Sequence, residues 1–215
     1  MNLDNYNTVI FDCDGVILNS NFKKTEAYKM AAIDFGANPD QAKMLEEHHV
    51  KNTGISRYVK FEYFLTKILN KPFIEQDFNF LITALNRRVK ESLLECEVAE
   101  GIDKLRQRYP NQNWMVMSGG DEEEVRELLT QKKVAHFFNL GIFGSPKSKH
   151  QILEERLTTS DFEPVIFFGD SKYDIDTAIK YDIDFLFFSG WTDFDGWESY
   201  LNDTKFQHRR YLKDL

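Results

Sequence analysis

Two carboxylates near the start of the chain have the spacing expected of a metal-assisted site. Asp12 and Asp14 follow the apolar run Val9-Ile-Phe and precede Gly15, which would let the chain turn away sharply. Alternate side chains of an extended segment point the same way, so both carboxylates can converge on one site. Two acids that close repel each other, and a divalent cation with oxygen ligands is a common remedy. Solvated loops also carry such pairs, so other motifs must decide.

A second polar motif, Ser118-Gly119-Gly120, follows the apolar run 114–117. A hydroxyl with exposed amides beyond it is suited to hold phosphate oxygens. The competing interpretation is an ordinary turn between a strand and a helix.

Two lysines, Lys147 and Lys149, lie where a predicted strand gives way to a predicted helix. A lysine at this place could neutralise the charge of a transferred phosphoryl group. Because the helix dipole disfavours cations at a helix start, a lysine there gives modest support to a functional role. We favour Lys149, with Lys147 as the alternative.

A second acid pair completes the set. Asp170 follows the apolar run 165–168, and Asp174 lies one helical turn later on the same face. The pair could hold Mg²⁺ directly or through neighbouring contacts, whereas helix capping by Asp170 is the competing interpretation. Each motif alone is only suggestive, but acid pair, Ser-Gly, Lys and acid pair at four successive strand ends are hard to dismiss together.

The elements that must position these motifs alternate in type. We predict strands at 7–12, 114–117, 141–143, 165–168 and 183–188, and helices at 121–132, 148–157 and 171–181. Such alternation predicts a parallel sheet with helices on both faces, and ligands in such sheets bind beyond the carboxyl ends of the strands. The stretch from Trp191 onward is aromatic and acidic and receives no assignment.

The segment between the first two predicted strands has a different pattern. Helical periodicity covers 20–36, 38–49, 55–70 and 77–95, and no convincing strand is seen. We therefore predict a core domain of residues 1–15 and 97–215 and an inserted helical domain of residues 16–96.

Charge and composition indicate which classes of binding partner and which cellular location to expect. The net charge is −8 and the basic residues are scattered, so neither nucleic acid nor an anionic membrane is an expected partner. Cys13 and Cys96 lie in different predicted units, which argues against a disulfide and favours a reducing cytoplasm. With no secretory signal and no apolar stretch near 18 residues, we expect a soluble cytoplasmic protein, monomeric or homodimeric.

The motifs in this order resemble those of the haloacid dehalogenase superfamily of phosphatases, over nearly the whole chain. The matching residues are Asp12-Cys-Asp14-Gly-Val16, Ser118-Gly119, Lys149 (or Lys147), and Gly169-Asp170 with Asp174. Residues 16–96 resemble the family's helical C1 cap, and 16–20 resemble members such as phosphoglycolate phosphatases and β-phosphoglucomutases. Those relatives commonly have an acid where this chain has Asn19. The resemblance implies an α/β fold, a doubly wound Rossmann-like parallel sheet core with an inserted all-helical cap domain.

The resemblance also implies a two-step mechanism for a phosphate monoester of a small metabolite, a sugar, polyol or hydroxy-acid phosphate. Asp12 would form an aspartyl-phosphate, and Asp14 would serve as general acid and then as general base. Ser118 and Lys149 would hold the phosphoryl oxygens. The implied cofactor is Mg²⁺, and its implied ligands are Asp12, the backbone carbonyl of Asp14, Asp170 and, through the metal shell, Asp174. The glycines after the serine, Gly119 and Gly120, would contact the substrate.

Within the predicted cap, 52–57 resembles a substrate-facing loop, and Arg57 could bind an anionic or polyol substrate or simply be solvated. His48 and His49 are interpreted as surface or packing residues. A phosphomutase would share every catalytic residue, so it remains an alternative. A non-catalytic binding module would be expected to have lost a motif, yet all four are intact. Asp14 favours phosphate esters over the family's dehalogenase and phosphonatase chemistries.

Overall fold

The core of the protein is one parallel β-sheet. The computed structural model describes residues 2–158 and 162–215, and its sheet has the strand order β3-β2-β1-β4-β5-β6 with every neighbouring pair parallel. The strands are β1 (Thr8–Phe11), β2 (Asn113–Asp121), β3 (Gly141–Ser145), β4 (Val165–Gly169), β5 (Asp184–Phe188) and β6 (Gln207–Arg209). The five predicted strands are confirmed, and β6 is an addition at one edge.

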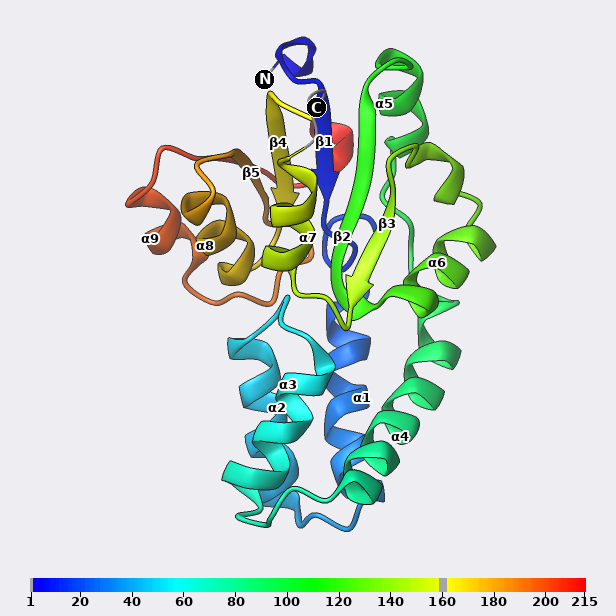
Figure 1. Ribbon diagram of the computed structural model, residues 1–215, viewed down its shortest axis with the longest axis vertical. Coiled ribbons are helices and arrows are strands. Elements are labelled where there is room, and N and C mark those ends of the chain that lie inside the picture. The colour runs from blue at the N-terminus through cyan, green and yellow to red at the C-terminus, as the bar shows by residue number, and fades with distance from the viewer. Residues whose placement is uncertain (1, 159–161) are drawn as a thin grey trace.

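Helices cover both faces of this sheet (Figure 1). They are α5 (Ile102–Arg108), α6 (Glu122–Gln131), α7 (Lys149–Arg156), α8 (Lys172–Lys180) and α9 (Trp197–Asn202). Successive residues of β1 contribute to opposite faces, with Val9 and Phe11 in one buried cluster and Ile10 in the other. The predicted doubly wound α/β core is therefore confirmed, and β1 lies at its centre.

Aromatic rings fix the position of β1. The ring of Phe11 lies 4.8 Å from that of Trp114, 5.6 Å from that of Phe138 and 5.1 Å from that of Phe168. These rings come from β2, β4 and the segment before β3, and all four are buried. Tilted and edge-on ring pairs of this kind add to the stabilisation from apolar burial. The residue after Phe11 is thus anchored to a rigid part of the sheet.

The inserted segment is helical, as predicted. It contains α1 (Asn21–Asp34), α2 (Pro39–Lys51), α3 (Arg57–Tyr63) and α4 (Glu75–Leu93). Figure 1 shows these helices grouped beyond the carboxyl ends of the strands. The single helix predicted at 55–70 is instead α3 followed by a π-helical turn, Phe64–Ile68. The exact limits of the cap, 16–96, remain a prediction.

Local sequence explains where the second of these helices begins. Asn38 accepts a hydrogen bond from the Gln41 backbone while the Gln41 side chain accepts one from the backbone of Asn38, and Pro39 occupies the first helical position. This reciprocal cap satisfies two backbone donors that a helix start leaves unpaired.

Elsewhere, the described helices include none that is both long enough and apolar enough to span a membrane. Cys13 and Cys96 are free and buried.

Candidate active site

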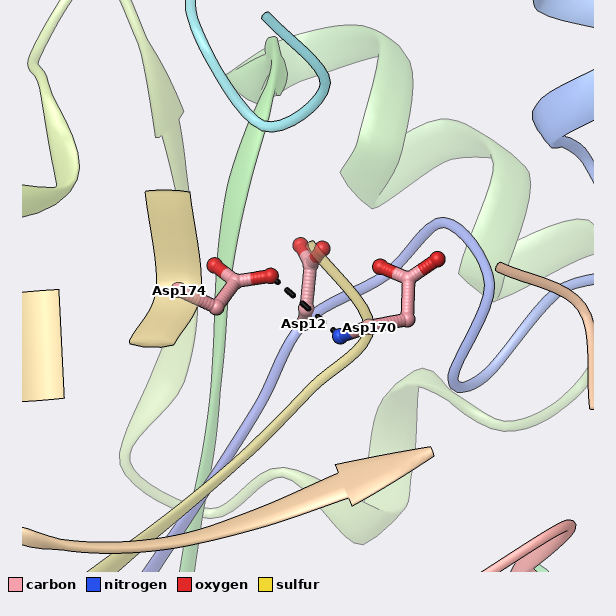
Figure 2. Close-up of side chains that lie close together, drawn as sticks. All are labelled: Asp12, Asp170 and Asp174. Atoms are coloured by element: carbon pink, nitrogen blue, oxygen red, sulfur yellow. Dashed lines mark hydrogen bonds between the residues drawn. The ribbon is translucent and has the colours of Figure 1, made fainter. Parts of the chain in front are cut away.

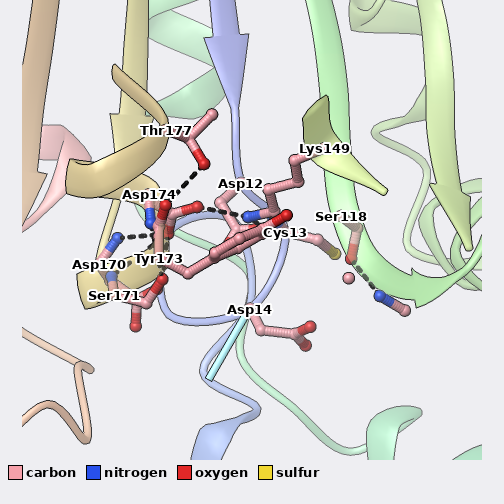
Figure 3. A network of polar contacts seen from close by, with 12 residues as sticks. Asp12, Cys13, Asp14, Ser118, Lys149, Asp170, Ser171, Tyr173, Asp174 and Thr177 are labelled. Atoms are coloured by element: carbon pink, nitrogen blue, oxygen red, sulfur yellow. Dashed lines mark hydrogen bonds and ion pairs between the residues drawn. The ribbon is translucent and has the colours of Figure 1, made fainter. Parts of the chain in front are cut away.

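The carboxyl ends of three adjacent strands bring the predicted motifs together. Phe11 is in register with Val116 of β2 and with Phe168 of β4, so the segments that follow these residues lie side by side. Asp12 comes directly after β1, Ser118 lies in β2 and Asp170 comes directly after β4. Figure 3 shows these side chains around one point, with Lys149 reaching in from the start of α7.

A buried lysine joins two of the acids. The Nζ atom of Lys149 lies 3.0 Å from Oδ1 of Asp12 and 2.5 Å from Oδ1 of Asp174, and all three side chains are buried. Burial raises the pKa of Asp12 to about 7, although Lys149 acts in the opposite direction. Burial alone would lower the pKa of Lys149, but the two carboxylates raise it, so this lysine stays charged.

Three carboxylates form a cluster that could hold a metal ion. Each of Asp12, Asp170 and Asp174 offers one oxygen, and these oxygens lie within 4.8 Å of one another (Figure 2). Oδ2 of Asp170 accepts a hydrogen bond of 2.7 Å from Asn21, whereas its buried Oδ1 has no hydrogen-bond partner among the described residues. Burial, reinforced by Asp12, Asp174 and Asp193, raises the pKa of Asp170 well above its usual value. Hard oxygen ligands with one unpaired buried oxygen fit Mg²⁺.

The helix that follows Asp170 explains how the last acid is oriented. Ser171, and not Asp170, caps α8, so the helix-capping interpretation of Asp170 is wrong. Oδ2 of Asp174 accepts hydrogen bonds from the Ser171 backbone and hydroxyl and from the Asp170 backbone. These bonds leave Oδ1 of Asp174 for Lys149. The capping box therefore also positions a site residue.

Gly15 makes the turn that directly follows Asp14. Its φ is +77°, and a Cβ atom there would lie 1.9 Å from Oδ2 of Asp170, so only glycine fits. Asp14 is held by the hydroxyl of Ser20 at 2.5 Å and by Nζ of Lys24 at 2.6 Å. Burial alone would raise the pKa of Asp14, but these partners lower it overall. In Figure 3 its carboxylate is turned away from Lys149.

The Ser-Gly-Gly motif lies against the cap. Ser118 is fully buried and its Oγ accepts a hydrogen bond of 3.0 Å from the Gly120 amide, which leaves the hydroxyl proton free to donate. A Cβ atom on Gly119 would lie 2.3 Å from the carbonyl oxygen of Gly54, a residue of the loop before α3. Glycine is needed here because the cap loop approaches β2 closely.

The two candidate lysines have different surroundings. Lys147 is exposed, and its Nζ lies 2.7 Å from both carboxylate oxygens of Glu155 on the surface. Lys149 is buried among the acids described above. The geometry therefore favours Lys149, and its catalytic role remains a prediction.

A cavity of about 30 Å³ lies between the site and the cap. Asp12, Asp14 and the two glycines line it from the core, and Arg57 lines it from α3. Arg57 is not solvated: it is buried and pairs with both oxygens of Glu124 on α6, at 2.9 and 2.7 Å. This pair ties α3 to the core, while substrate binding by Arg57 stays a prediction.

Several residues that line the cavity were not predicted from the sequence. Lys24 and Tyr28 of α1 and Lys60 of α3 face it, as does Asn21, the partner of Asp170. A signal was present for Lys24, because it shares helical spacing with the apolar face of α1. His49 also lines the cavity, and its ring stacks on Tyr28 with centroids 4.1 Å apart, which is packing as expected.

Comparison with known proteins gives a family for this architecture. A family model described as haloacid dehalogenase-like hydrolase matches residues 9–188, which include all four motifs. No curated protein sequence matches the chain.

Solved structures share the fold over almost the whole chain. A haloacid dehalogenase-like family hydrolase from Streptococcus pneumoniae is 17% identical with a TM-score of 0.69, covering 98% of this chain and 97% of that one. A predicted phosphatase from Clostridium acetobutylicum is 19% identical with a TM-score of 0.72, covering 95% and 94%. A predicted phosphoglycolate phosphatase from Haemophilus somnus is 17% identical with a TM-score of 0.67, covering 86% of each chain. At sequence identities of 17–19%, the likeness to these structures establishes the fold alone.

Proposed function

Because the chain belongs to the haloacid dehalogenase-like hydrolase family, we propose that it is a Mg²⁺-dependent phosphatase acting on the phosphate monoester of a small metabolite. The observation that carries this proposal is the buried group of Asp12, Lys149, Asp170 and Asp174 at the carboxyl edge of the sheet. A nucleophile, a fixed cation and a hard-metal site within one buried cluster are the parts that phosphoryl transfer needs.

Asp12 is the nucleophile in this proposal. One of its carboxylate oxygens attacks phosphorus, forming a bond to the phosphoryl group while the bond from phosphorus to the ester oxygen breaks. Water then attacks phosphorus, which releases inorganic phosphate and restores the carboxylate. The fixed ion pair with Lys149 at 3.0 Å keeps the Asp12 side chain oriented for this attack.

Asp14 is the general acid and the general base in this proposal. It donates a proton to the leaving oxygen in the first step and takes one from the attacking water in the second. Lys24 and Ser20 lower its pKa in the absence of substrate, which suits the second role. The negative charge of an arriving phosphoryl group acts in the opposite direction, raising the pKa of Asp14 toward a value that suits the first role.

The remaining residues stabilise charge. Lys149 and the Ser118 hydroxyl hold oxygens of the transferring group, because the charged Nζ of Lys149 lies beside Asp12 and the Ser118 hydroxyl proton is free to donate. A Mg²⁺ ion held by Asp12, Asp170 and the Asp14 carbonyl, with Asp174 orienting its surroundings, would neutralise negative charge on that group.

The closed cap limits the substrates. A cavity of about 30 Å³ has room for little more than water, so the cap must move outward to admit an ester and is then suited to enclose a small one. A phosphorylated protein side chain would prevent the cap from closing. We therefore expect a small phosphorylated metabolite as substrate.

Removal of divalent metal is expected to abolish activity. EDTA should lower phosphate release by at least about 100-fold, because several kcal/mol of charge stabilisation are lost, and added Mg²⁺ should restore it. Saturating Mg²⁺ should also raise the melting temperature of the protein by about 5 °C, because the ion neutralises buried acids. Differential scanning fluorimetry measures this shift independently of turnover.

Two variants sharpen this metal test. Asp170→Asn should lose most of the Mg²⁺-induced shift, whereas Asp182→Asn, whose side chain is 96% exposed, should keep it. A shift that persists in Asp170→Asn would place the metal elsewhere.

The proposed function itself is tested by phosphate release from a panel of small phosphate monoesters in the presence of Mg²⁺. Release of inorganic phosphate from at least one ester supports the proposal. Isomerisation of a sugar phosphate without net release would favour the phosphomutase instead. Absence of both reactions across the panel would contradict the proposal.

A further inference from the structure

Among the described residues, Lys60 is a lysine of the cavity wall that forms no ion pair. Lys60 of α3 lines the same cavity as Asp12 and is 2% exposed. Its Nζ lies 3.0 Å from Nδ1 of His49, and 5.3 Å from the centre of the Tyr28 ring. Within residues 2–158 and 162–215, no carboxylate comes within 4 Å of this nitrogen.

The other cations around the cavity are all paired. Lys24 lies 2.6 Å from Asp14, and Arg57 lies 2.7 Å from Glu124. Lys149, next to the cavity, has two acids, as described above. A buried ammonium without a carboxylate in ion-pair contact is costly, so Lys60 differs from these three.

The charges around Lys60 explain why it is poorly compensated. Burial lowers its pKa to about 7, and this effect outweighs the opposing charges of Asp193 and Asp14. Lys24 and Arg57 lower the pKa further. His49 is neutral, because burial and the nearby Lys60 lower its own pKa well below the usual value. A negative charge beside Lys60 would therefore be strongly favoured.

The position of Lys60 shows which part of a substrate it would meet. The cavity has Asp12 and Asp14 on its core side, and Lys60, His49 and Tyr28 on its cap side. A phosphoryl group bound at Asp12 would direct the rest of the ester toward the cap. The part of the substrate that leaves with the ester oxygen would thus approach Lys60.

We propose that Lys60 binds a second anionic group of the substrate, a carboxylate or a second phosphate carried by the part that leaves. This inference rests on the phosphatase function above and extends it to a substrate class. The anionic group of the substrate would form the ion pair that Lys60 does not form with a carboxylate of the described residues. The lysine acts as a specificity residue and takes no part in bond breaking.

Binding to the Asp12→Asn variant tests the inference without turnover. Isothermal titration calorimetry with Mg²⁺ present would compare two matched pairs in which a hydroxymethyl group replaces a carboxylate. The pairs are 2-phosphoglycolate with 2-hydroxyethyl phosphate, and 3-phosphoglycerate with glycerol 3-phosphate. We expect the carboxylate to bind about 10- to 100-fold more tightly in at least one pair, the range for a hydrogen bond to a charged group. Glycerol 1,3-bisphosphate, which carries a second phosphate, distinguishes the two kinds of anion.

The double variant that combines Asp12→Asn with Lys60→Met should bind the carboxylate and hydroxymethyl esters with affinities within about 3-fold of each other, because the charge of Lys60 is gone. Lys67→Met is the matched control, since Lys67 lies in the same helical domain but is exposed, and it should keep the full preference. Asp193→Asn should also keep it, whereas a purely structural Lys60–Asp193 interaction predicts its loss.

The melting temperature of Lys60→Met shows separately whether this variant folds. The pKa of Lys60 is lower in the folded chain than its usual value of 10.5, so the unfolded chain binds more protons between pH 7 and 10.5. Charged Lys60 therefore opposes folding near pH 7, and Lys60→Met is expected to keep or raise the melting temperature. Retained affinity for the neutral esters would show that the rest of the site is intact.

The outcomes separate this inference from the proposed function. An anion preference that depends on Lys60, without phosphate release by the unmodified protein, would uphold the anion site and contradict the phosphatase. Phosphate release with equal affinity for anionic and neutral esters would overturn the anion site alone. A preference that survives Lys60→Met, a loss in Asp193→Asn, or no binding of any of these esters would also overturn it.

Discussion

Asp12→Asn is expected to lower kcat for phosphate release by at least about 10⁴-fold, because removal of a nucleophile leaves only binding and charge stabilisation. An amide oxygen in the same place is a poor nucleophile toward phosphorus. Steady-state phosphate release with saturating Mg²⁺ and substrate measures the effect. The loss should appear in kcat, since the side chain is nearly the same size and substrate can still bind.

The fold should tolerate this change. Burial raises the pKa of Asp12 to about 7, so its carboxylate is already disfavoured, and a neutral amide adds no buried charge. Lys149 keeps Asp174 as a partner at 2.5 Å. The melting temperature is therefore expected to change by only a few degrees. Asp182→Asn, on the exposed surface, is the matched control and should keep full activity. Activity within 10-fold of the unmodified protein would rule out Asp12 as the nucleophile.

Lys149→Met is expected to damage both catalysis and stability. The change removes the cation between Asp12 and Asp174, and it leaves buried acids without compensation. Breaking a buried ion pair from one side costs about 3–5 kcal/mol of unfolding free energy. Loss of a fixed donor to the transferring group should lower kcat by about 10²- to 10³-fold. Chemical denaturation and phosphate release measure the two effects.

Lys147→Met is the control for the lysine assignment. Its Nζ contacts only Glu155 on the surface among the described residues, and such exposed pairs contribute about 0–1 kcal/mol. Its kcat should stay within about 3-fold of the unmodified protein. Mg²⁺ should restore part of the stability of Lys149→Met, because a bound cation supplies positive charge to the same acids. A larger loss of activity in Lys147→Met than in Lys149→Met would reverse the assignment.

Much of the catalytic edge could be predicted because it depends on local pattern and sheet topology. Apolar β-branched runs ending in polar residues predict buried parallel strands, and parallel strands place their carboxyl ends at one edge. Asp12, Ser118 and Asp170 were therefore expected at one edge of the sheet, and the observed strand order, with β1 between β2 and β4, makes them neighbours. The choice between two lysines needed the structure, because the spacing of a helix start does not say which side chain points inward.

The cap side of the cavity could not be predicted in the same way. The pairing of Arg57 with Glu124 joins residues 67 positions apart and depends on how α3 packs on α6. Lys60 stands between Val59 and Phe61, and nothing in that local pattern shows that its ammonium would be buried without an acid. β6, Gln207–Arg209, escaped prediction because a three-residue edge strand of polar residues has no apolar alternation.

The most direct test is to identify the phosphorylated residue. In Asp14→Asn the base for the second step is missing, while acetyl phosphate has a leaving group that needs no proton, so the intermediate should accumulate. After incubation with acetyl phosphate and Mg²⁺, acid quenching and peptide mass spectrometry should find one phosphoryl group, and it should lie on Asp12. A phosphoryl group on any other residue would contradict the account.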